Sequence, residues 1–132
     1  MVYLDTSAAA KLLIRELESV ALQDYLDHLL PDGVPVSSVL LETELRRFGV
    51  RYDLSQAAIS DVLDRVDLVE PDRSLFAEAG LLPGPDLRSL DALHVATALR
   101  VDASVVVAYD HQLRRAARAV GLATTAPGKA SD

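Results

Sequence analysis

Two acidic residues of this 132-residue chain follow directly on apolar runs that predict buried strands. Asp5 comes after Val2–Leu4, and Asp110 comes shortly after the β-branched run Ser104–Ala108. In open α/β folds, ligands bind beyond the carboxyl ends of the strands, so an acid at this place is positioned for chemistry. Either acid, taken alone, is equally well explained as the N-cap of the helix that follows.

Two further acids, Glu44 and Asp91, lie in predicted helices. With Leu40 as the origin and about 100° per residue, Glu44 lies near 40°, on the apolar face, whereas Glu42 lies near 200°. An inward carboxylate costs several kcal/mol unless it is paired, hydrogen-bonded or metal-bound. Asp91 opens a helix that is apolar nearly all round, where the helix dipole alone can explain an acid. Because four such placements by accident are improbable, we expect a shared site.

Carboxylates that gather in one place repel one another, and a divalent cation relieves the repulsion and attracts phosphate. The formal net charge of −7 argues against a chain that grips nucleic acid by general positive charge, although it does not exclude a nuclease. The chain has no cysteine, which excludes thiol chemistry and favours the cytoplasm. We find no secretion leader and no apolar run near the ~20 residues of a membrane span.

The composition, 50% hydrophobic and 25% charged, predicts one compact domain over residues 1–125 with a flexible tail over 126–132. Hydrophobic periodicity predicts alternating strands and helices. The expected strands are 2–5, 34–36, 67–69, 104–108 and 122–125. The expected helices are 8–15, 17–30 (closed by Pro31-Asp32-Gly33), 39–50 (capped by Ser37 or Ser38), 54–66, 72–82 (closed by Pro83-Gly84-Pro85), 90–101 and 111–120. This alternation predicts an α/β fold with a central, mainly parallel sheet of four to five strands flanked by helices.

Four segments, in this order, resemble the PIN-domain ribonucleases, and in particular VapC-type toxins of VapBC toxin–antitoxin systems. They are Leu4–Ser7, Ser38–Arg47, Leu87–His94 and Ala108–Asp110. The resemblance covers about Val2–Gly121, and the Leu-Asp-Ala-Leu-His sequence at Leu90–His94 is its most specific part. It implies a three-layer α/β/α PIN-like fold.

The resemblance implies that a cluster of four acids holds Mg²⁺ or Mn²⁺ for hydrolysis of RNA phosphodiester bonds. These acids are Asp5, Glu44, Asp91 and Asp110. It further implies polar support from Thr6 or Ser7, while Arg88 stands close to Asp91 in the sequence. The implied partners are an RNA substrate and a cognate VapB-type antitoxin, with a homodimer that forms a heterotetramer or larger assembly. The amphipathic stretch Leu12–Leu30 would supply the antitoxin groove and much of the dimer surface.

Two departures from the family pattern support an alternative, a non-catalytic PIN-like scaffold that binds RNA or a protein. Ala108 stands where many relatives have Thr or Ser, and Gln112 stands where some have another acid. A phosphotransferase of the haloacid-dehalogenase type is a poor match, because Ser7 occupies the place of its second Asp. For His94, a hydrogen-bonded core histidine is the commoner case, with orientation of Asp91 as the other interpretation. Arginines such as Arg46 and Arg114 either contact RNA phosphates or form solvated helix faces.

Overall fold

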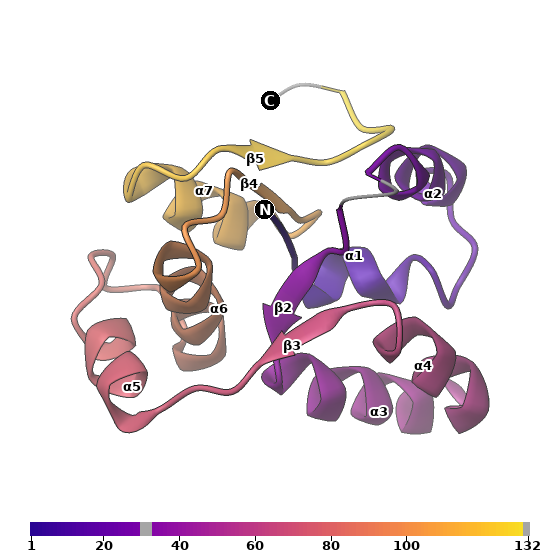
Figure 1. Ribbon diagram of the computed structural model, residues 1–132, viewed down its shortest axis with the longest axis horizontal. Coiled ribbons are helices and arrows are strands. Elements are labelled where there is room, and N and C mark those ends of the chain that lie inside the picture. Colours follow the sequence, from indigo (N-terminus) through magenta and orange to yellow (C-terminus); the bar gives the residue numbers. More distant parts are fainter. Residues whose placement is uncertain (30–32, 131–132) are drawn as a thin grey trace.

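The computed structural model of the chain describes residues 1–29 and 33–130, and its strands form one five-stranded sheet (Figure 1). The strands are β1 (Val2–Leu4), β2 (Val36–Ser38), β3 (Asp67–Val69), β4 (Val105–Val107) and β5 (Thr124–Thr125). Their order is β3-β2-β1-β4-β5, and every neighbouring pair is parallel. The predicted parallel sheet is therefore confirmed, with β1 and β4 side by side at its centre.

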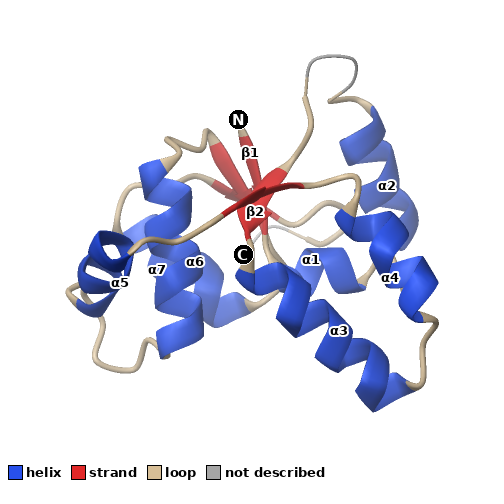
Figure 2. Cartoon of the chain, turned by 60° about the horizontal axis from the view of Figure 1, so that its bottom comes forward, coloured by secondary structure: helices blue, strands red, loops and turns tan. Residues whose placement is uncertain are grey.

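Helices cover both faces of the sheet (Figure 2). In the described ranges they are α1 (Thr6–Ala10), α2 (Ser19–Asp27), α3 (Leu40–Tyr52), α4 (Gln56–Leu63), α5 (Arg73–Gly80), α6 (Ser89–Arg100) and α7 (His111–Ala119). Leu4 and Val107 point into a core shared with α1 to α4, whereas Tyr3 and Val106 point into a core shared with α6 and α7. Alternate strand residues thus face opposite layers. This arrangement confirms the three-layer α/β/α architecture.

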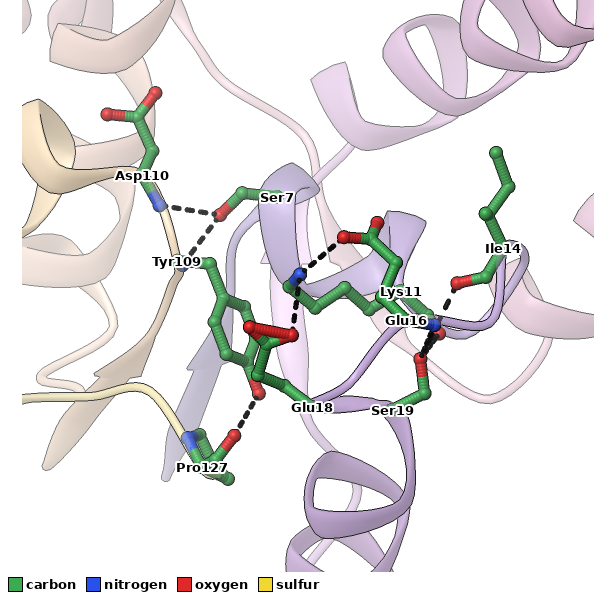
Figure 3. Close-up of polar contacts among 9 residues, drawn as sticks. All are labelled: Ser7, Lys11, Ile14, Glu16, Glu18, Ser19, Tyr109, Asp110 and Pro127. Carbon is green, nitrogen blue, oxygen red and sulfur yellow. Dashed lines mark hydrogen bonds and ion pairs between the residues drawn. The ribbon is translucent and has the colours of Figure 1, made fainter. Parts of the chain in front are cut away.

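The first helix was expected over residues 8–15, and the prediction is wrong at both ends. α1 begins at Thr6, because the Asp5 carboxylate caps it, and ends at Ala10. Lys11 then turns inward, where its ammonium contacts Glu16 at 3.0 Å and Glu18 at 3.3 Å (Figure 3). Ser19 donates to the carbonyl of Lys11 at 2.8 Å, so the segment between α1 and α2 is a folded loop rather than a helix.

The second strand lies two residues later than the expected 34–36. β2 spans Val36–Ser38, since Ser37 pairs with Leu68 and Ser38 with Val69 of β3. Both serines are therefore fully buried strand residues, and Val39 takes the N-cap position of α3. The Ser38 hydroxyl still accepts the backbone N–H of Leu40 at 3.1 Å.

The remaining differences lie at the ends of elements. α2 ends at Asp27, and its expected stop at Pro31-Asp32 lies outside the described residues. α4 begins at Gln56 rather than Leu54, because the hydroxyl of Ser55 caps it. In the tail, the Tyr109 hydroxyl donates to the carbonyl of Pro127 at 2.7 Å, while flexibility of 126–132 stays a prediction. None of the helices among the described residues has the length and apolar character that a membrane span requires.

Candidate functional site

The four predicted acids come from four different parts of the fold. Asp5 leaves β1 and caps α1, and Asp110 follows β4 and caps α7. Since Leu4 pairs with Val107, these two acids leave neighbouring strands at the same edge of the sheet. Glu44 lies in the second turn of α3 and Asp91 in the first turn of α6.

Ser7 connects the ends of the two central strands (Figure 3). Its hydroxyl donates to Oδ2 of Asp5 at 2.7 Å, and its backbone N–H donates to the same oxygen at 3.2 Å. The hydroxyl oxygen also accepts the backbone N–H groups of Tyr109 at 2.9 Å and Asp110 at 3.2 Å. The side chain of Ser7 therefore fixes the Asp5 carboxylate relative to the backbone of Asp110.

Glu44 is held in a second set of hydrogen bonds. Its Oε1 accepts the hydroxyl of Thr6 at 2.9 Å and contacts Nε2 of His94 at 2.6 Å. The other ring nitrogen of His94, Nδ1, lies 2.6 Å from the Tyr3 hydroxyl. That hydroxyl accepts the backbone N–H of Ser38 at 3.2 Å, so the set joins β1, β2, α1, α3 and α6.

The pKa values of Asp5 and Asp91 are raised by burial and, to a smaller extent, by the charges of neighbouring carboxylates. Burial raises the pKa of Asp5, whose exposed fraction is 5%, and the charge of Glu44 raises it further. Burial also raises the pKa of Asp91, with added repulsion from Asp110 and Asp5. Burial alone would lower the pKa of His94, but its hydrogen bond to Glu44 and the nearby carboxylates raise it. Such shifts are typical of sites where like charges are brought together.

Each of the four carboxylates uses one oxygen within the protein and leaves the other without a hydrogen bond among the described residues. The engaged oxygens are Oδ2 of Asp5, Oε1 of Glu44, Oδ1 of Asp110, which accepts two amides of α7, and Oδ2 of Asp91, which lies 3.8 Å from Arg88. Hard carboxylate oxygens are the ligands that Mg²⁺ and Mn²⁺ prefer, so the donor chemistry fits these ions. Within residues 1–29 and 33–130, however, no three acidic or histidine side chains already form a group that could hold a metal ion. The four acids as metal ligands remain a prediction.

The predicted supporting residues lie beside these acids. Thr6 and Ser7 make the contacts described above, and Arg88, with a side chain 71% exposed, lies next to Asp91. Glu42 points outward and pairs with Arg46 at 2.7 Å, as its helical angle predicts. Arg46 is therefore engaged within the protein, where it also contacts Gln56 and Ser60.

Sequence reasoning gave Tyr3 no role, and for His94 it favoured a hydrogen-bonded core histidine over orientation of Asp91. His94 is 1% exposed and lies against Glu44 and Tyr3, so the core-histidine interpretation is correct for its burial. The hydrogen bond that it makes is to Glu44 rather than to Asp91. The available signal was the polar Tyr3 in the middle of an apolar strand, because a buried hydroxyl requires a partner.

Comparisons with known proteins agree with this arrangement along almost the whole chain. The model of the PIN domain family matches residues 2–119. Ribonuclease VapC35 of Mycobacterium tuberculosis (strain ATCC 25618 / H37Rv) is 41% identical over 136 aligned positions, which cover 98% of this chain and 99% of that protein. Ribonuclease VapC46 of the same strain is 40% identical, covering 96% of this chain and 97% of that protein.

A solved structure has the same fold. It is the crystal structure of VapBC2 from Rickettsia felis bound to a DNA fragment from their promoter, matched with a TM-score of 0.69 at 18% identity. The match covers 95% of this chain and 98% of that chain. Because the family model matches residues 2–119 and the relatives match along almost their full length, the chain belongs to the PIN domain family, in which it groups with the VapC proteins.

Proposed function

We propose that this chain is an endoribonuclease that depends on Mg²⁺ or Mn²⁺ and acts as the toxin of a type II toxin–antitoxin pair. One observation supports the proposal: Asp5 and Asp110 leave neighbouring strands at the same end of the sheet, and, in addition to burial, the charges of Glu44 and Asp110 raise the pKa values of Asp5 and Asp91 respectively. Each of these four carboxylates has one oxygen without a hydrogen bond among the described residues. The full-length similarity to proteins named ribonuclease VapC supports RNA as the substrate.

In this proposal Asp5, Glu44, Asp91 and Asp110 would hold the ion. When bound, Mg²⁺ or Mn²⁺ would supply positive charge for the phosphate and activate the attacking water. The residues of the chain orient the acids, since Ser7 fixes one oxygen of Asp5. Because water is the nucleophile, no covalent link between protein and RNA is required.

Arg88 has a positioning role for the substrate in this scheme. Its guanidinium is largely exposed and lies 3.8 Å from Asp91, so it stands at the border of the acidic site. An exposed arginine there can donate to phosphate oxygens of RNA and offset the repulsion between the acids and the backbone of the substrate.

We further propose that a VapB-type antitoxin and a second copy of the chain cover the surface around α2. Leu17, just before this helix, is 99% exposed, and Val20, in its first turn, is 55% exposed, although both residues are apolar. Apolar side chains exposed together are typical of interaction surfaces. Gel filtration with light scattering, with and without the co-expressed antitoxin, measures this assembly, and a monomer in both samples would contradict it.

The activity is tested with the antitoxin-free chain and total RNA in Mn²⁺ or Mg²⁺. We expect discrete fragments that disappear with EDTA, return when metal is added back, and are absent with Asp5→Asn. Glu42→Gln is the matched control, because Glu42 is an exposed acid on the same helix as Glu44, and this variant should cleave like the natural protein.

A non-catalytic scaffold is the second candidate, and one observation favours it: the described acids do not already form a metal-holding group. It predicts that the folded chain binds RNA without cutting it, at any concentration of Mn²⁺. If the folded chain binds RNA in the same assay but leaves it intact, the scaffold function would replace the proposed ribonuclease activity.

A further inference from the structure

His94 and Tyr3 form a buried pair that contacts the carboxylate of Glu44 through His94. Tyr3 is fully buried and His94 is 1% exposed, and their rings meet edge to face with centroids 5.9 Å apart. Both ring nitrogens of His94 have partners, the Tyr3 hydroxyl at Nδ1 and Glu44 at Nε2. The imidazole therefore cannot rotate without losing a buried hydrogen bond.

The direction of the contact to Glu44 follows from its chemistry. An ionised carboxylate only accepts hydrogen bonds, so the hydrogen between the two groups lies on Nε2 of His94. This holds whether the ring is neutral or charged. Thr6 donates to the same oxygen, Oε1, at 2.9 Å. Two donors thus fix one oxygen of Glu44, and Oε2 has no hydrogen bond among the described residues.

We propose that His94, held by Tyr3, is a positioning residue that keeps Glu44 ready to bind a divalent cation through Oε2 alone. This inference rests on the proposed metal-dependent activity. Glu44 needs such support because it lies on a separate helix, α3. Its contacts with Thr6 of α1 and His94 of α6 connect it to the two helices that begin at or near Asp5 and Asp91. Partners that orient a metal ligand typically change metal affinity or activity 10-fold to 100-fold when they are removed.

If His94 were only a structural core residue, its substitutions would have different effects. Two variants distinguish the positioning role from a purely structural role. In His94→Gln the side-chain amide can reach the position of Nε2 and still donate to Glu44. In His94→Asn the shorter amide reaches only the position of Nδ1, next to Tyr3. A purely structural role predicts that both variants lose stability and that neither changes metal binding in the folded protein.

The experiment measures Mn²⁺ affinity of the full chain by electron paramagnetic resonance, together with kcat and KM for RNA cleavage. For His94→Asn we expect roughly 10-fold to 100-fold weaker Mn²⁺ binding and a similar fall in kcat, with KM for RNA within about twofold. His94→Gln should recover most of both losses. His28→Gln, in an exposed histidine at the end of α2, is the control and should match the natural protein.

Tyr3→Phe keeps the ring and removes only the hydroxyl that holds Nδ1 of His94, so it tests the positioning of His94 if His94→Asn does not fold. We expect Mn²⁺ affinity and kcat to fall in this variant too, but by less than in His94→Asn. The role of His94 would be overturned if folded His94→Asn bound Mn²⁺ as tightly as the natural protein does. If His94→Asn is unfolded, the same result in folded Tyr3→Phe would overturn it. Equal losses in His94→Asn and His94→Gln would also overturn it, and each of these results would leave the proposed activity intact. If the natural protein itself neither binds Mn²⁺ nor cleaves RNA, the proposed function fails, and this inference fails with it.

Discussion

The hydroxyl oxygen of Ser7 accepts the backbone N–H of Asp110 at 3.2 Å, although 103 residues separate the two in the sequence. The same hydroxyl donates to Asp5 at 2.7 Å. Two acids at the ends of neighbouring strands are therefore tied to each other through one small side chain, whose contacts with Tyr109 and Asp110 are drawn in Figure 3. The parallel pairing of β1 with β4 brings them within its reach.

Ser7→Ala should weaken both the fold and the activity. The substitution leaves the amides of Tyr109 and Asp110 without their acceptor, which costs about 1 to 3 kcal/mol of unfolding free energy. It also removes the shorter of the two hydrogen bonds that hold Oδ2 of Asp5, so cleavage should fall roughly tenfold or more. Urea unfolding and RNA cleavage check this. Ser74→Ala, in an exposed serine of α5, should change the free energy of unfolding by less than about 0.5 kcal/mol. A similar change in the free energy of unfolding and in cleavage for both variants would show that the contacts of Ser7 have no specific role.

Asp5→Asn should make the metal-free protein more stable while it abolishes cleavage. Burial raises the pKa of Asp5, so the folded state holds this proton more tightly than the unfolded state does. Stability from this group is then present at low pH and is lost as pH rises from the unfolded pKa through the folded pKa. Asparagine does not titrate, and it can still cap α1. Urea unfolding in EDTA at pH 5 and pH 8 should show an advantage of the variant that grows with pH. A variant that is equally destabilised at both pH values would contradict this.

Metal affinity should rise with pH between about 5.5 and 8. The pKa values of both Asp5 and Asp91 are raised, chiefly by burial and for Asp91 also by Asp110, so protons compete with the cation at pH values above the ordinary range of a carboxyl group. Calorimetric titration with Mn²⁺ measures the slope. Asp91→Asn should flatten it, whereas Glu42→Gln should leave it unchanged. A flat affinity in the natural protein would count against a metal held by these carboxylates.

Two glutamates of α3 provide a matched pair for the site. Glu44→Gln should reduce cleavage about a hundredfold or more, because it removes a charge from the proposed ion site. Glu42→Gln removes only an exposed ion pair with Arg46, worth about 0.5 kcal/mol or less, and should leave cleavage unchanged. Cleavage rates at saturating Mn²⁺ check the pair. Equal losses would show that the effect comes from the helix and not from the position of Glu44.

Local sequence patterns were sufficient to place some of the acids. The 100° rotation per residue separates Glu44 from Glu42, and the structure has Glu44 against His94 and Glu42 paired at the surface. Asp5 and Asp110 likewise follow the two apolar runs that became β1 and β4. These predictions depend on one element each, which is why periodicity was enough.

Contacts between distant parts of the chain could not be predicted in this way. Tyr3 and His94 are 91 residues apart, and their contact depends on how α6 packs against β1. The bounds of β2 were wrong because Ser37 and Ser38 are polar, yet they are buried strand residues beside β3. A strand of three residues is too short to show the alternation that would have identified it.

The most direct test of the central claim is anomalous X-ray diffraction from crystals of the antitoxin-free chain soaked in Mn²⁺. The account predicts a manganese peak at the carboxyl edge of the sheet, bound by carboxylate oxygens of Asp5, Glu44, Asp91 and Asp110, with Oε2 as the ligand from Glu44. A peak elsewhere, or no peak among these four side chains in crystals that contain Mn²⁺ at a saturating concentration, would contradict it.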